Sequence, residues 1–437
     1  MINSESLQFN LIKFAKKYNS KIHRSGQNIN TSAYCYMPAF GLSQGHFKIR
    51  PQSVRNFFFS LIYFAKDLIL ISTLSNFKVK KLNQFYKKKY ENLIVSWAKK
   101  KDFSKSGVYF DRYLGLNSKN KNTIWFLLYS DSKIPRNLEK NIILIYREKK
   151  FINIFFLFKY IFSTIKKNIF NLKNILHKLS SFTCHAFIVN NFFLNVLKNA
   201  EFKKILFPFE SQPFQNLIIS STKKYNKKIK LIAYEHSIDA FPINNLYKKL
   251  PLDIFYVHSK AQEFFYAKYF GWPKSKIKHI TSKRFFKRKK SSFENIIFLP
   301  LDISQKNFFL EKLDFYLNSN TCKNLTKLNI KIHPAMENSA RHITFKKEIV
   351  DLLNQHNNKF LSKKGTKLTI CMGATSSVVE ILEHNLKVIH IIRNPTFDAC
   401  SKLLWPKIIR KKISENIFEY FLKKNGSCVT LRKEKKI

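Results

Sequence analysis

The sequence predicts an α/β protein with two doubly wound parallel sheets that face a cleft. From residue 123 onward, short apolar runs alternate with stretches of helical periodicity, which is typical of parallel strands joined by crossover helices. The alternation falls into two series, separated by the basic polar segment 286–295. Because a domain usually takes about 100–200 residues, we expect an amino-terminal domain over 1–285, with a helical amino-terminal region, and a carboxyl-terminal domain over 286–437.

The first series follows a lysine-rich region around 77–104, whose pattern predicts helices. A long helical region is expected over 151–180, and a second helix over 213–225. A third, over 259–270, begins at a Ser259 N-cap and ends before Gly271 and Pro273, a typical pair of stop signals. The strands of this series are expected at 123–130, 141–146, 185–191, 203–210, 228–236, 252–258 and 277–281.

The second series repeats the same alternation after the basic segment. After its first strand one helix is expected to end at about residue 318, and two more are expected over 344–355 and 375–384. The tail from about residue 402 is expected to be helical and basic. Its strands are expected at 296–302, 328–334, 368–373 and 387–392.

The composition excludes several classes of protein. Apolar residues make up 45% of the chain, which is too many for a wholly disordered protein. Glycine occurs only 9 times in 437 residues, and neither GxGxxG nor GxxxxGK[ST] is present, so dinucleotide and P-loop binding have no motif. Six scattered cysteines without a CxxC pair indicate neither a disulfide framework nor a zinc ribbon, and they fit a reducing cytoplasm.

The formal net charge of +52 has more than one explanation. Lys, Asn, Ile, Phe and Tyr, all abundant here, have AT-rich codons, so a codon bias would spread lysine over the surface whatever the function. Only 12 of the 79 basic residues are arginine, the cation that nucleic-acid sites favour for bidentate contacts. The scarcity of arginine therefore argues against a nucleic-acid partner, which is kept only as an alternative, and attraction to an anionic membrane surface stays open.

Two apolar segments approach membrane character. Residues 57–74 are long enough to span a bilayer, but Lys66 and Asp67 lie at their centre, where charge is costly. Residues 151–164 are too short and carry Lys159. Buried or amphipathic helices are expected, with an interfacial helix facing anionic lipid as the alternative. The amino terminus lacks the apolar core of a signal peptide, which favours a cytoplasmic protein, peripheral on the inner membrane face at most.

The second series carries two features that can bind an anion. Gly373 ends a predicted strand, and the helix after it begins within Thr375-Ser376-Ser377. Free N–H groups and hydroxyls at a helix start bind phosphate, although such residues are also ordinary N-caps. In a chain that avoids glycine, Gly373 indicates a backbone need for positive φ or close approach. His333-Pro334 ends another strand, at the edge where open α/β sheets bind ligands.

The first series carries an acid–base pair. Glu210 follows the strand at 203–210, and His236 follows the next strand along the chain. Parallel neighbours would place both side chains at one rim of the sheet. A carboxylate and an imidazole there can act as a general base and its orienter, or they can be exposed turn residues.

Taken in chain order, the motifs of both series resemble those of bacterial surface-carbohydrate (capsule or lipopolysaccharide-type) glycosyltransferases with the GT-B fold. The His-Pro pair followed by a hydroxyl-rich helix start is also similar to bacterial sialyltransferases and CDP-glycerol glycerophosphotransferases. The matching residues are Glu210-Ser211-Gln212-Pro213-Phe214, Tyr234-Glu235-His236-Ser237, Asp253, Ser282 with Arg284, Lys331-Ile332-His333-Pro334, and Gly373-Ala374-Thr375-Ser376-Ser377 with Glu380. The chain departs from the pattern in lacking a glycine after Glu210 and in carrying Ser282 where relatives often have glycine.

The resemblance implies transfer of a sugar from a nucleotide-sugar to a surface polysaccharide or lipid-linked glycan, without metal or other cofactor. Glu210 and His236 are the expected catalytic residues. The expected donor-binding residues are Arg284, Lys331, His333, Pro334, Gly373, Thr375, Ser376, Ser377 and Glu380. Two alternatives stay open, a transferase using a CMP- or CDP-activated donor and a basic non-catalytic protein that binds nucleic acid or membrane.

Overall fold

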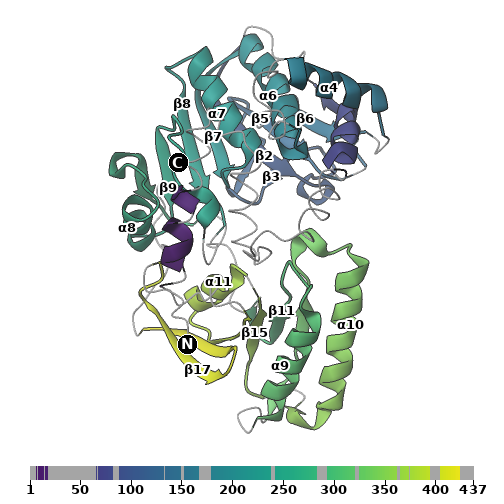
Figure 1. Ribbon diagram of the computed structural model, residues 1–437, viewed down its shortest axis with the longest axis vertical. Helices are drawn as coiled ribbons and strands as arrows, with labels where there is room; N and C mark the ends of the chain where they lie inside the picture. Colours follow the sequence, from purple (N-terminus) through teal and green to yellow (C-terminus); the bar gives the residue numbers. More distant parts are fainter. Residues whose placement is uncertain are drawn as a thin grey trace.

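The computed structural model describes residues 6, 8–13, 15–17, 65, 67–81, 88–131, 133–148, 152–166, 179–237, 242–282, 293–319, 324–361, 365–373, 375–393 and 404–423. These residues form two large sheets, one from strands before residue 280 and one from strands after residue 295 (Figure 1). Both are mostly parallel, with helices between the strands. The predicted α/β class with two doubly wound sheets is confirmed.

The first sheet has the strand order β1-β6-β5-β2-β7-β8-β9-β10. All neighbouring strands pair in parallel except β1 and β6, which are antiparallel. Counted from β2, the chain order of the strands is 3-2-1-4-5-6-7, so the topology reverses between β2 and β7. Its strands are β1 (Phe77–Lys80), β2 (Lys88–Ala98), β5 (Thr123–Tyr129), β6 (Ile142–Arg147), β7 (Ala200–Phe209), β8 (Lys230–Glu235), β9 (Ile254–Val257) and β10 (Ile277–His279).

The two faces of this sheet are covered differently. Alternate side chains of a strand point to opposite faces, so Leu93 and Val95 of β2 join the hydrophobic core under helices α6 (Ser181–Asn199) and α7 (Pro213–Tyr225). Ile94 joins the core on the other face, where Tyr109 and Leu114 from the segment after β2 cover it. Helix α4 (Ile154–Lys166) precedes α6, and α8 (Lys260–Lys268) joins β9 to β10.

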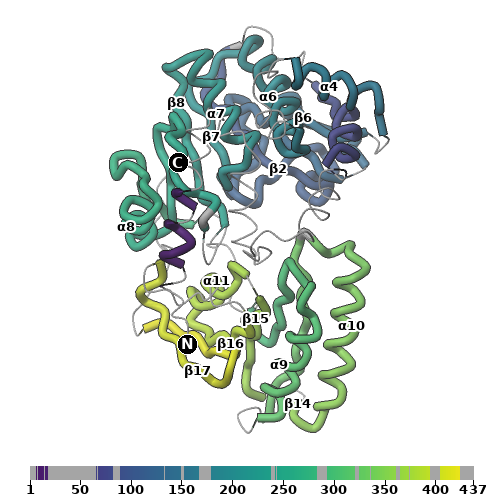
Figure 2. The backbone as a smooth tube through the Cα atoms, in the orientation of Figure 1, coloured from purple at the N-terminus to yellow at the C-terminus, as the bar shows by residue number. Residues whose placement is uncertain are grey.

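The second sheet has the order β13-β11-β15-β16-β18-β17. Its first four strands are parallel and follow the chain order 2-1-3-4, so its topology reverses between β11 and β15. Figure 2 shows α9 and α10 side by side in the lower lobe. The elements are β11 (Ile296–Phe298), α9 (Lys306–Asn318), β13 (Asn329–Lys331), α10 (Ala340–Gln355), β15 (Thr369–Met372), α11 (Ser377–Glu383), β16 (Val388–Ile391), β17 (Ile408–Ser414) and β18 (Ile417–Leu422).

Three expectations from the sequence are wrong. Residues 77–80 and 88–98 form strands β1 and β2 rather than helices, since side chains on both faces of β2, from Leu93 to Ser96, are buried. Residues 185–191 lie within helix α6, whose buried positions follow helical spacing, and a short apolar run cannot tell strand from buried helix. The tail from 404 forms the antiparallel hairpin β17–β18, with Asn416 at a φ of +67° in its turn.

The two membrane candidates are mostly helical where they are described, and in the second the helix begins at Ile154. Asp67 accepts hydrogen bonds from the hydroxyl (2.5 Å) and the backbone N–H (3.4 Å) of Ser181, so its carboxylate caps the start of α6. Among the described residues no helix has the length and apolarity to cross a bilayer. Residues 57–64, Lys66, 167–178 and most of the 286–295 boundary segment lie outside the described residues.

Candidate active site

The candidate active site lies at the carboxyl edge of the first sheet. Strands β2, β7 and β8 are neighbours, and the topology reverses between β2 and β7. In open α/β sheets this reversal leaves a place for a ligand just beyond the carboxyl ends of the two strands. Glu210 follows β7 and His236 follows β8. The expected rim of acid–base residues therefore lies beside the switch point.

Glu210 and His236 contact each other directly. Glu210 Oε1 lies 3.0 Å from His236 Nε2, and Glu210 Oε2 accepts a hydrogen bond of 2.7 Å from the side-chain amide of Gln212. The Glu210 side chain is 25% exposed, whereas that of His236 is only 4% exposed. Of the two, the carboxylate is therefore the group that a substrate can reach.

The turn that carries Glu210 is held from several sides. Gln215 Oε1, at the first turn of α7, accepts hydrogen bonds from the backbone N–H groups of Glu210 (3.0 Å) and Gln212 (3.2 Å). Asn244 Nδ2 donates to the Glu210 carbonyl at 2.9 Å. Between them Ser211 has a φ of +55°, the left-handed region that costs a non-glycine residue energy. These contacts fix the direction in which the Glu210 side chain leaves the sheet.

Two aromatic side chains pack on His236. The ring of Tyr113 lies edge-on to the imidazole with centroids 4.7 Å apart, and the indole of Trp97, the penultimate residue of β2, lies at 5.5 Å. Both rings are partly exposed. His236 Nδ1 is buried and has no hydrogen-bond partner among the described residues. The imidazole is thus held by packing against the two rings and by the contact of Nε2 with Glu210 Oε1.

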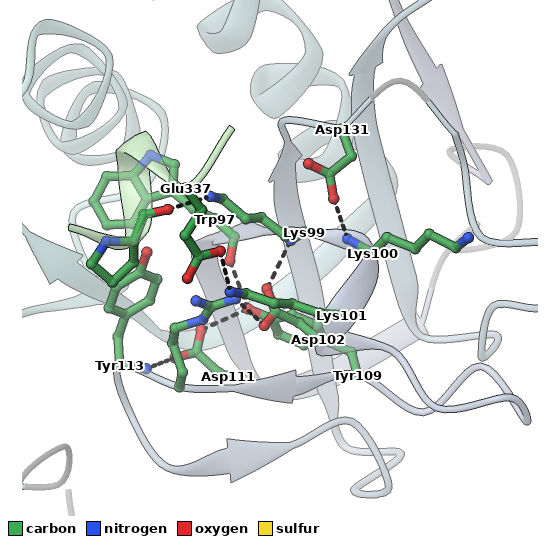
Figure 3. A network of polar contacts seen from close by, with 12 residues as sticks. Trp97, Lys99, Lys100, Lys101, Asp102, Tyr109, Asp111, Tyr113, Asp131 and Glu337 are labelled. Carbon is green, nitrogen blue, oxygen red and sulfur yellow. Dashed lines mark hydrogen bonds and ion pairs between the residues drawn. The ribbon is translucent and has the colours of Figure 1, made fainter. Parts of the chain in front are cut away.

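A network of carboxylates orders the segment after β2 (Figure 3). Asp102 accepts a hydrogen bond of 2.7 Å from the Lys99 backbone N–H and pairs with Arg112. Asp111 is fully buried and accepts hydrogen bonds from the hydroxyl of Tyr109 (3.0 Å) and the backbone N–H groups of Tyr113 and Leu114 (both 2.8 Å). Burial raises the pKa of Asp111. The network sets Tyr113 in place against His236.

The same segment contacts the second sheet's half of the molecule. Lys101 Nζ lies 3.2 Å from a carboxylate oxygen of Glu337, and Lys99 Nζ lies 3.5 Å from the Pro334 carbonyl (Figure 3). Pro334 and Glu337 follow β13, so the carboxyl edges of the two sheets lie against each other here. His333 is partly exposed in the same turn, and its carbonyl accepts a hydrogen bond of 2.7 Å from the Met336 N–H. Lys331 is exposed, with its ammonium 5.4 Å from the centre of the Phe298 ring.

The glycine and hydroxyl residues lie at the switch point of the second sheet. Gly373 ends β15 with a φ of +63°, so the predicted need for positive φ is confirmed. A Cβ there would lie 3.0 Å from Pro300, the second residue after β11. In the next turn Thr375 Oγ1 accepts a hydrogen bond of 3.2 Å from the Ser377 N–H, and the Ser376 hydroxyl makes no capping hydrogen bond.

Other residues from the motif lie away from these edges or cannot be placed. Glu380 is buried, and its charge, together with burial, raises the pKa of Cys371. Asp253 lies at the amino end of β9, where it pairs with Lys223 (2.8 Å) and accepts from the Leu231 N–H (2.7 Å), so it serves the fold at the opposite edge. Ser282 is buried. Arg284 lies outside the described residues. No three His, Cys, Asp or Glu side chains cluster as metal ligands in the part of the chain that is described.

The segment 97–113 contributes side chains to the site that the sequence pattern did not predict. Four of its side chains lie between the two sheets or against His236, namely those of Trp97, Lys99, Lys101 and Tyr113. The sequence predicted helices around 77–104 and no functional residue in the first 120 residues. A signal was present, because the run Leu93–Ala98 is a short, mostly apolar stretch with an aromatic residue, Trp97, next to its end, and three lysines follow it. Such a run is typical of a buried central strand whose end carries polar residues.

Comparisons with known proteins show a distant likeness among solved structures. No protein-family model and no curated protein matches the chain. Among solved structures, a glycosyltransferase from Rickettsia africae ESF-5 is similar, with a TM-score of 0.31 and 12% sequence identity, over 71% of this chain and 86% of that one. A likeness at this level does not establish an activity.

Proposed function

We propose that this protein is a glycosyltransferase that moves a sugar from a nucleotide-activated donor to a hydroxyl group of a surface polysaccharide or lipid-linked glycan. The observation that carries the proposal is the Glu210–His236 pair, 3.0 Å apart, beside the switch point of one sheet. The segment after β2, which packs on His236 through Trp97 and Tyr113, also contacts the β13 turn of the other sheet through Lys99. This arrangement offers a base from one half and phosphate-binding groups from the other.

In the proposed reaction Glu210 is the general base. Its carboxylate takes the proton of the acceptor hydroxyl as the acceptor oxygen bonds to the sugar, while the bond from the sugar to the nucleotide phosphate breaks. Gln212 and His236 hold the two carboxylate oxygens in place. The partly exposed rings of Trp97 and Tyr113 supply an apolar wall, as small-molecule sites commonly have.

The leaving nucleotide phosphate needs positive charge and hydrogen-bond donors, for which the proposal requires neither metal nor cofactor. We assign this role to His333 and Lys331, to the backbone turn of Gly373 and to the hydroxyls of Thr375–Ser377, with Lys99 and Lys101 from the opposite half. The roles of Arg284, Pro334 and Glu380 remain predictions from the motif. The proposed acceptor places the enzyme at the cytoplasmic face of a membrane.

Thermal-shift screening against nucleotides and nucleotide-sugars tests the donor. A ligand at about 100 times its Kd adds about 2.7 kcal/mol to the free energy of unfolding. The panel includes CMP- and CDP-activated compounds, because stabilisation by these alone favours sialyl or glycerophosphate transfer. Stabilisation by oligonucleotides and by no nucleotide would instead support the non-catalytic alternative.

Turnover of the Glu210→Gln variant tests the base. We expect about a 10²–10⁴-fold loss of kcat with nucleotide affinity retained, because a general base acts in the transition state. Glu263→Gln is the matched control, since Glu263 also pairs with a histidine, His279, at 2.8 Å but does so at the far edge of the first sheet. Near-normal kcat in both Glu210→Gln and His236→Ala would show that the base lies elsewhere.

A further inference from the structure

Helix α4 presents a row of large apolar side chains to solvent. Phe155 is 89% exposed, Phe162 70% and Phe158 63%, and Ile154 and Ile165 are also exposed. Large apolar residues exposed singly, such as Phe264 in α8 and Phe315 in α9, are ordinary on a protein surface. Five of them on one helix of 13 residues form a patch of the kind that marks an interaction surface.

These side chains lie on the opposite side of α4 from its packing contacts. At about 100° per residue, the five exposed residues fall within an arc of about 100°. Phe156, Leu157 and Tyr160 point the other way and pack against the cluster formed by Ile71, Leu74 and Cys184, which joins α4 to α6 and the helix at 67–73. The helix is therefore anchored by one apolar face and exposes a second. Figure 1 shows α4 at the outer end of the first sheet's lobe.

The charge around this face has a single sign. Lys159 and Lys166 are exposed and border the arc of apolar residues. From residue 149 to residue 200 the sequence contains eight lysines and no aspartate or glutamate. An apolar stripe flanked by lysines matches the interface of an anionic bilayer, where acyl chains lie beneath negative headgroups.

We propose that the exposed face of α4, namely Ile154, Phe155, Phe158, Phe162 and Ile165 with Lys159 and Lys166, docks on an anionic membrane surface. Thirteen residues span about 20 Å, less than the roughly 30 Å hydrocarbon core, so α4 lies in the interface and does not cross it. A second copy of the chain is the poorer occupant, because a net charge of +52 makes two copies repel. The inference is independent of glycosyl transfer, since docking needs neither donor nor acceptor.

Sedimentation of the full chain with extruded vesicles tests the docking. We expect binding to vesicles of phosphatidylglycerol and phosphatidylcholine in equal parts, weaker binding to phosphatidylcholine alone, and a decrease with added salt. Replacing the exposed pair Phe158→Ser and Phe162→Ser should lower the partition coefficient at least about 100-fold, because each ring loses its burial in the bilayer. Lys159→Gln with Lys166→Gln should lower binding to the anionic vesicles by about 25-fold.

Matched substitutions at other exposed positions separate docking from general effects. Phe264→Ser with Phe315→Ser removes two rings of similar exposure, and Lys346→Gln with Lys347→Gln removes two exposed lysines of α10. Both control pairs should bind vesicles like the wild type, and all variants should keep its urea midpoint.

Vesicle binding that is unchanged by Phe158→Ser with Phe162→Ser, or lost equally in the control pairs, would overturn the proposal. A second outcome would also overturn it: the wild type is a dimer in light scattering, Phe158→Ser with Phe162→Ser makes it a monomer, and neither protein binds vesicles. The exposed face of α4 would then bind a second copy of the chain. A protein that binds vesicles but no nucleotide would keep the docking surface and lose the proposed function.

Discussion

Replacing Gly373 with alanine probes the turn at the switch point of the second sheet. Gly373 has a φ of +63°, and a Cβ on it would lie 3.0 Å from Pro300 Cβ and 3.1 Å from Phe309 Cζ. The left-handed backbone costs an alanine about 1–2 kcal/mol, and crowding against a rigid proline ring adds about 1–3 kcal/mol. Alanine also reduces the conformational entropy of the unfolded chain, which stabilises the folded protein by less than about 1 kcal/mol. The free energy of unfolding should fall by about 2–4 kcal/mol.

Gly271 provides the matched control for this substitution. It follows α8 with a φ of +77°, but a Cβ there would meet nothing within 4 Å. Gly271→Ala therefore has the backbone cost without the crowding and should lose only about 1 kcal/mol. Urea unfolding measures both variants, and an unchanged m-value shows that the midpoint reports stability.

The difference between the two variants isolates the contact with Pro300 and Phe309. Equal losses in Gly373→Ala and Gly271→Ala would refute the reasoning, because the turn at 373 would then have room for a side chain. The packing argument also fails if Gly373→Ala unfolds at the wild-type urea concentration.

Two further predictions concern the donor site and acid stability. His333→Ala and Ser376→Ala should each weaken nucleotide binding by about 1–3 kcal/mol in calorimetry, because each would remove a hydrogen bond to phosphate. Unchanged affinity in both folded variants would mean that the hydroxyls at 375–377 only cap the helix and do not bind phosphate. Burial, with a smaller effect of Arg147, lowers the pKa of His185 from 6.5 to about 4. The unfolded chain therefore binds the His185 proton more tightly than the folded chain does. The contribution of His185 to the free energy of unfolding, up to about 3 kcal/mol, is present above pH 6.5 and is lost as pH falls towards 4. Urea midpoints of the wild type and His185→Gln between these pH values should diverge accordingly, and parallel curves would contradict the assignment.

Local pattern predicted many of the elements. The helix at 213–225 has Pro213 at its first turn and was placed with the observed bounds. Strands β5, β8, β9, β15 and β16 lie within the apolar runs that predicted them, and β6 extends one residue beyond its run. Glu210 and His236 were placed at one rim because consecutive strands β7 and β8 are neighbours in the sheet, which the alternation of strand and helix makes probable. Their catalytic roles stay a prediction.

Local pattern failed where the strands depend on distant partners. Strands β2 and β17 each contain two adjacent lysines, a pattern that did not predict a strand. Pairing of β2 with β5 and β7, and of β18 with β16, decided the structure in these two places. Asp253 belongs to the motif that resembles glycosyltransferases, but it lies at the amino end of β9, at the opposite edge of the sheet from Glu210 and His236. A sequence motif does not show at which end of a strand a neighbouring residue lies.

The two α/β series, the neighbouring positions of Glu210 and His236, and the positive φ of Gly373 could be predicted from the sequence, since each depends on residues close together in the chain or on consecutive strands. Only the tertiary structure placed β2 at the centre of the first sheet, set Trp97 and Tyr113 against His236, and joined Lys101 to Glu337 across the two halves. The physical reason is that hydrophobic periodicity reports which face of an element is buried, whereas strand order depends on the burial and hydrogen bonding of the whole sheet. The exposed face of α4 needed the structure as well, because its sequence is equally apolar on the side that packs and the side that does not.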